Sequence, residues 1–131
     1  MKDKYVRKAS SVRVVDGDTI EATIDLGYHT QVITQTFRLH GIDAYETRRG
    51  AWYKKLPKEE GERLLELGKK AKSLVQDLVN TADEVWIQSI KGSSKGKYGR
   101  WLAILFAYHH EKCINVNSLL VKKGFAIKKD Y

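Results

Sequence analysis

The stretch Thr19-Ile20-Glu21-Ala22-Thr23-Ile24-Asp25-Leu26 alternates strictly between polar and apolar residues. A period of two is typical of a strand that buries one face and exposes the other. Gly27 begins a turn, and residues 31–39 form the returning strand. On that strand Phe37 and Leu39 point one way, so Arg38 must point toward solvent or a ligand. The sequence therefore predicts a β-hairpin with an arginine beside its end.

Five other segments show clear patterns of their own. Val12 to Val15 is an apolar strand, while residues 84–90 and 101–108 are expected to form two more strands. Between the hairpin and the expected strand at 84–90, apolar residues recur at helical spacing from Lys58 to about Asn80. A shorter helix, capped by Asn115 or Asn117 and ending at Gly124, is expected near the C-terminus.

This order of elements predicts the fold class. Three strands, a long helix, two strands and a short helix indicate an α+β, mainly β domain. The arrangement that fits is a five-stranded Greek-key barrel of the OB-fold type, with the long helix after the third strand. Such a barrel often binds oligonucleotides, but the fold alone does not distinguish cutting from binding.

The overall composition narrows the class of protein. The chain has 131 residues and no internal repeat, so residues 1–131 are expected to form a single domain. One cysteine, Cys113, excludes an internal disulfide framework and a multi-cysteine zinc site. No apolar run approaches the roughly 20 residues of a membrane span, and residues 1–11 do not resemble a signal peptide. We expect a monomer, either cytoplasmic, phage-encoded or secreted with its signal removed.

The charge indicates a polyanionic partner. The formal net charge is +8 and the pI is near 9.5; nucleic acid is the simplest partner for such a surface. Residues 91–100 carry four cations and no acid, and residues 48–58 carry five. The expected loop at 48–57 also contains Trp52 and Tyr53, and mixed cations and aromatics suit phosphate contact and base stacking.

Three carboxylates, Asp18, Asp43 and Glu46, are candidates to hold a calcium ion, because calcium prefers oxygen ligands. Each alone is an ordinary turn or loop acid. The predicted hairpin, however, places the start of one strand beside the end of the other, so Asp18 is expected close to Asp43. Arg38 and Arg100 are either surface cations or phosphate-binding groups, since a guanidinium binds phosphate oxygens in pairs.

Four ordered blocks carry a resemblance to a known family. They are Val15-Asp16-Gly17-Asp18-Thr19, Phe37-Arg38-Leu39-x-Gly41-Ile42-Asp43-Ala44-x-Glu46-Thr47, Lys97-Tyr98-Gly99-Arg100, and Val116-Asn117-x-x-Leu120-Val121-x-x-Gly124-x-Ala126. Together they resemble the thermonuclease (staphylococcal nuclease-like) family over nearly the whole chain. One departure is Tyr45, where the family usually has proline.

The resemblance implies roles for particular residues. Asp18, Asp43 and the Ala44 carbonyl would bind Ca²⁺, while Arg38, Glu46 and Arg100 would be catalytic. Tyr98 resembles a tyrosine that contacts nucleotide phosphate. From their charge and position, Lys97, Lys54 and Lys55 are expected to hold the substrate strand.

The predicted function is a calcium-dependent endonuclease, a hydrolase that cleaves DNA and RNA phosphodiesters with little sequence specificity. Cleavage that leaves 3′-phosphates is implied by the resemblance alone. One alternative is a non-catalytic OB-fold module that binds single-stranded nucleic acid. Another is a basic domain that binds an acidic protein or a membrane surface.

Overall fold

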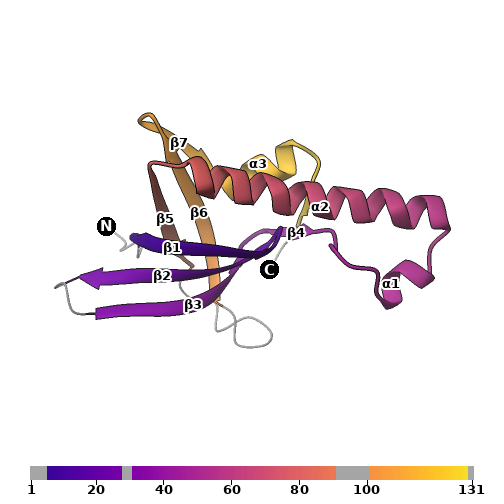
Figure 1. The fold of residues 1–131 in the computed structure, drawn as a ribbon, viewed down its shortest axis with the longest axis horizontal. Coiled ribbons are helices and arrows are strands. Elements are labelled where there is room, and N and C mark those ends of the chain that lie inside the picture. Colours follow the sequence, from indigo (N-terminus) through magenta and orange to yellow (C-terminus); the bar gives the residue numbers. More distant parts are fainter. Residues whose placement is uncertain (1–5, 28–30, 91–100, 130–131) are drawn as a thin grey trace.

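The computed structural model describes residues 6–27, 31–90 and 101–129, and Figure 1 shows their arrangement. The main sheet contains β1 (Val6–Asp16), β2 (Thr19–Gly27), β3 (Gln31–Leu39), β5 (Glu84–Ser89), β6 (Trp101–His109) and β7 (Lys112–Asn115). Its strand order is β3-β2-β1-β5-β6-β7. A smaller sheet pairs β4 (Ile42–Ala44) with β8 (Ala126–Lys128).

The main sheet closes on itself. The two ends of the series β3-β2-β1-β5-β6 meet through a parallel pairing of β3 with β6, from Phe37↔Trp101 to Leu39↔Ala103. Every other neighbouring pair in the series is antiparallel. The predicted mainly β, five-stranded barrel with helices is therefore confirmed, including the hairpin that residues 19–39 form.

The long helix α2 (Lys58–Thr81) matches the predicted span of about 58 to 80. It lies along one side of the barrel, and in Figure 1 its N-terminal part extends beyond the sheet. Its buried positions are Gly61, Leu65, Gly68, Ala71 and Val75. This spacing of three and four residues forms the single stripe by which a surface helix packs on a core. No helix in the described part of the chain is both long and apolar enough to span a membrane.

Several short elements were not predicted. The expected loop at 48–57 is wrong over α1 (Ala51–Lys54), a helical turn in which Tyr53 packs against Gly61 of α2. β4, β7 and β8 have three or four residues each, too few to show a period. β1 begins at Val6 instead of Val12, because pairing with both β2 and β5 extends it through a polar stretch.

A two-residue turn connects β6 to β7. His109 ends β6, Lys112 begins β7, and only His110 and Glu111 connect them. Both have positive φ, 50° and 69°, as a two-residue hairpin turn with the twist of its strands requires.

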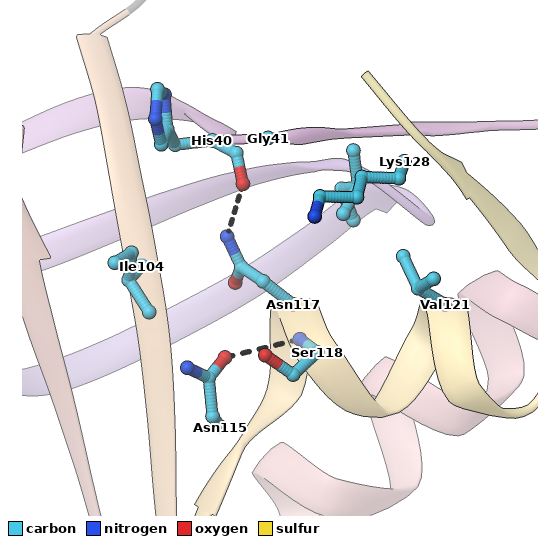
Figure 2. Close-up of a pocket in the computed structure, with 9 residues that line it drawn as sticks. His40, Gly41, Ile104, Asn115, Asn117, Ser118, Val121 and Lys128 are labelled. Atoms are coloured by element: carbon cyan, nitrogen blue, oxygen red, sulfur yellow. Dashed lines mark hydrogen bonds between the residues drawn. The ribbon is translucent and has the colours of Figure 1, made fainter. Parts of the chain in front are cut away.

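The C-terminal helix α3 (Val116–Lys122) is capped by Asn115, whose side chain accepts a hydrogen bond from Ser118 N at 3.1 Å. One residue into the helix, Asn117 is buried. Its amide donates to the carbonyls of His40 at 2.9 Å and Ala103 at 3.1 Å, while its oxygen accepts from Leu105 N. Figure 2 shows Asn117 reaching the His40 carbonyl across the pocket. Asn117 thus fixes the end of β3, immediately before the segment that carries Asp43.

Candidate active site

The candidate site lies where the β2–β3 hairpin ends. Thr19 pairs with Arg38 in the hairpin register. The Leu39 amide also donates to the Asp18 carbonyl at 2.7 Å. Because these backbone contacts fix the two strand ends together, Asp18 and Arg38 become neighbours although they are twenty positions apart in the sequence.

Arg38 contacts both aspartates of the predicted metal set. Its Nη1 lies 3.4 Å from Asp18 Oδ2, and its Nη2 lies 3.1 Å from Asp43 Oδ1. Only 14% of the Arg38 side chain is exposed. A sheltered guanidinium that joins two carboxylates is held more firmly than a surface ion pair, which would contribute little. Arg38, Asp18 and Asp43 therefore form one cluster.

Asp18 is the most fixed member of this cluster. It is 7% exposed; its Oδ1 accepts from the Thr19 hydroxyl at 3.0 Å and its Oδ2 accepts from the Ala44 amide at 3.0 Å. The backbone of Ala44 therefore adjoins the Asp18 carboxylate. Asp43 is more open, with 36% of its side chain exposed, and its Oδ2 lies 3.6 Å from Lys129 Nζ.

Glu46 sits in an acidic surrounding. It helps to line a pocket of about 190 Å³ together with Asp16, Thr47, Arg48, Lys72 and Val15. Glu46 is an exposed residue overall, although its carboxyl is partly desolvated. Burial, followed by the charges of Asp16, Asp18 and Asp43, raises the pKa of Glu46, and Arg38 opposes that rise. The carboxylates thus influence one another electrostatically.

Close backbone packing positions the segment that carries Glu46. A Cβ atom on Gly68 would lie 2.1 Å from the Glu46 carbonyl oxygen and 2.6 Å from that of Tyr45. A Cβ atom on Gly17 would lie 2.7 Å from the Ala71 Cβ. α2 therefore lies directly against both the 16–18 turn and the Glu46 segment. This close approach is possible because glycine has no Cβ atom.

A hydrogen bond adds a further constraint beside Glu46. The Thr47 hydroxyl donates to Asp16 Oδ1 at 2.8 Å. Sequence reasoning did not select Asp16, Lys129 or Gly68 as functional. Asp16 lies in the same acidic turn as Asp18, which was the available signal; nothing in the sequence indicated Gly68, because its role depends on a contact with a distant segment.

Five of the predicted residues are not seen at the aspartate cluster, for two different reasons. Arg100, Lys97 and Tyr98 fall outside the described residues. Lys54 and Lys55 are exposed at the end of α1, which Figure 1 shows near the N-terminus of α2, away from β4. The structure therefore does not bring these two lysines to the aspartate cluster.

The donors suit calcium by chemistry. Among the described residues, no three His, Cys, Asp or Glu side chains are grouped closely enough to hold a metal ion. The predicted set, however, has two carboxylates and one backbone carbonyl, and calcium completes its six to eight ligands with water. Asp18 and Asp43 share one guanidinium, and the charges of both raise the pKa of Glu46. This excess of negative charge fits a cation, provided that Arg38 releases a carboxylate.

Comparison with known proteins supplies the family. The family described as staphylococcal nuclease homologue matches residues 36–131, well over half of the chain. An uncharacterised protein of Methanocaldococcus jannaschii is 31% identical over 121 residues, a match that covers 88% of this chain. The match covers 56% of that relative, so the chain spans a little over half of its length. The barrel and the family match agree: this chain belongs to the staphylococcal nuclease homologue family.

Proposed function

We propose that this protein is a calcium-dependent nuclease that hydrolyses the phosphodiester bonds of DNA and RNA with little sequence specificity. The contact of one sheltered guanidinium, Arg38, with both Asp18 and Asp43 carries this proposal. A protein that only binds nucleic acid has no need of several neighbouring carboxylates, one of them buried, beside an arginine. Family membership supports nuclease-type chemistry.

In this proposal, Asp18, Asp43 and the Ala44 carbonyl hold the calcium ion. When bound, calcium supplies positive charge at the scissile phosphate. Arg38 then exchanges its carboxylate contacts for phosphoryl oxygens, for which its planar fork is suited. There it stabilises the extra negative charge of the five-coordinate transition state. By resemblance, Arg100 is a second such group.

Glu46 is the proposed general base. It orients a water molecule for in-line attack at phosphorus and accepts the proton that this water loses. Its raised pKa makes it a better proton acceptor than an ordinary glutamate, provided that it is ionised. The bond between phosphorus and the 5′ oxygen breaks, and this oxygen takes up a proton from solvent, so that the product carries a 3′-phosphate, as the resemblance implies.

Weak sequence specificity is expected for a physical reason. Sequence is read mainly at base edges, whereas phosphate contacts position the nucleic acid without reading it. The described residues of the candidate site offer charged groups for phosphate, and none of them is arranged to read a base. Lys97 and Tyr98 remain proposed substrate contacts, and Lys54 and Lys55 are proposed to contact more distant parts of a long strand.

The test is degradation of single-stranded DNA and of RNA with calcium, with magnesium and with EDTA. Wild type is compared with Glu46→Gln and with the control Glu59→Gln, which alters an exposed acid at the start of α2. We expect cleavage with calcium in wild type and the control, and none with EDTA or in Glu46→Gln. A folded wild-type protein that binds DNA without cutting it would instead establish the non-catalytic binding module.

A further inference from the structure

A groove beside the candidate active site has no role in the proposed chemistry. Its volume is about 410 Å³, and Thr47 and Arg48 form one wall. The other wall is α2, through Lys69, Lys72, Ser73 and Gln76. These positions are i, i+3, i+4 and i+7, so they lie along one face of the helix. We call this feature the α2 groove.

The α2 groove carries positive charge that the described residues do not neutralise. None of its lining residues is acidic. Within the described part of the chain, Arg48, Lys69 and Lys72 form no ion pair. Other cations of the same two segments form ion pairs: Arg49 lies 2.9 Å from Glu62, and Arg63 of α2 pairs with Glu60.

The α2 groove is continuous with the pocket of Glu46. Thr47, Arg48 and Lys72 line both. A chain that leaves the proposed active site in this direction therefore passes from carboxylates directly to cations. From Lys69 to Gln76 the helix extends about 10 Å, compared with one phosphate per about 3.4 Å of helix axis in each strand of B-DNA.

We propose that the α2 groove binds the sugar–phosphate backbone of the polynucleotide on one side of the scissile bond. Arg48, Lys69 and Lys72 would contact phosphate oxygens, and the hydroxyls of Thr47 and Ser73 with the amide of Gln76 would add hydrogen bonds. Such contacts are independent of sequence. The inference rests on the proposed function, because it takes a polynucleotide to be the substrate.

The test uses Lys69→Gln combined with Lys72→Gln. The matched control combines Lys70→Gln with Lys123→Gln, which removes the same charge from exposed lysines outside the α2 groove. Binding of a fluorescent single-stranded DNA of about 16 nucleotides, near the upper site size of an OB fold, is followed by anisotropy in EDTA. Thermal unfolding confirms that each variant is folded.

We expect the groove variant to bind about tenfold more weakly at low salt. The slope of log K against log salt should flatten by about 1.4, since each lost contact to a single strand removes about 0.7. With calcium, KM for long DNA should rise by a larger factor than KM for a dinucleotide, which is too short to extend along the α2 groove. The control should keep the wild-type slope.

Two results would contradict the proposed role of the α2 groove without contradicting the proposed nuclease function. In the first, wild type cuts DNA and the groove variant keeps the wild-type slope of log K against log salt. The other is an equal flattening in the control, which would indicate diffuse attraction by net charge. A wild type that neither binds nor cuts DNA would instead reject the proposed function, and the groove with it.

Discussion

The Glu46 pocket and the α2 groove share three lining residues, yet they differ in how firmly their charged side chains are fixed. Near Glu46, Asp18 is buried and fixed by the Ala44 amide, and Thr47 bonds Asp16. In the α2 groove, Lys69 is exposed and Lys72 half-buried, both on long side chains. Chemistry at one phosphorus requires fixed geometry, whereas attraction of a polyanion requires only charge.

This contrast predicts that a change in the fixed region alters rate more than affinity. Arg38→Ala removes the guanidinium that joins Asp18 and Asp43. We expect kcat to fall by on the order of 10²–10³, as for loss of a preorganised transition-state donor, while DNA affinity changes little. Single-turnover cleavage measures this loss. Full activity in a folded Arg38→Ala protein would remove Arg38 from the catalytic set.

The second-largest effect is expected from the close packing of α2 against the Glu46 segment. Gly68→Ala would place a Cβ 2.1 Å from the Glu46 carbonyl. Alanine normally gains about 0.5–1 kcal/mol over glycine in a helix, but overpacking typically costs about 1–3 kcal/mol. We expect net destabilisation and reduced cleavage, since the Glu46 segment must move. Urea unfolding and kcat measure the two effects.

Gly50→Ala is the control for that substitution, because a Cβ there meets nothing closer than 3.4 Å. It should retain wild-type stability and activity. If Gly68→Ala proved more stable and equally active, the close contact between α2 and the Glu46 segment would have no functional importance.

The hydrogen bond beside Glu46 offers a smaller test. Thr47→Val removes the hydroxyl that donates to Asp16 at 2.8 Å. We expect a loss of about 1 kcal/mol in the free energy of unfolding and a modest decrease in kcat. Thr47→Ser keeps the hydroxyl and should restore both; if valine and serine behaved alike, the hydrogen bond would be unimportant.

The smallest expected effect concerns pH. Because the pKa of Glu46 is raised above 4.5 in the folded protein, ionising Glu46 disfavours folding above that raised value. The penalty disappears as pH falls through the raised pKa to below the unfolded value. Without calcium, Glu46→Gln should therefore be slightly more stable than wild type at neutral pH, by about 0.5 kcal/mol or less.

The stability difference should vanish at acidic pH, where Glu46 is protonated in wild type. Calcium should also remove it, because a cation near the carboxylates favours their ionised forms. Melting temperatures across pH, with EDTA and with calcium, provide the measurement. A Glu46→Gln protein less stable than wild type at neutral pH would contradict the acidic surrounding described above.

The sequence by itself determined the barrel and the long helix. Strict alternation over residues 19–26 fixes a half-buried strand, and helical spacing over residues 58–80 fixes a face, because both patterns depend only on local geometry. The hairpin also predicted that Asp18 and Asp43 lie close together, as the shared contact with Arg38 shows. Their roles in binding metal stay a prediction.

Only the tertiary structure decided how α2 meets the site. The tight contact of Gly68 with Glu46 and the continuity of Lys72 with both pockets depend on where a distant helix docks. The same holds for β4 and β8, which are too short to show a period and exist because each supplies the other with a partner. Local patterns specify elements, whereas docking of those elements through the core specifies which side chains meet.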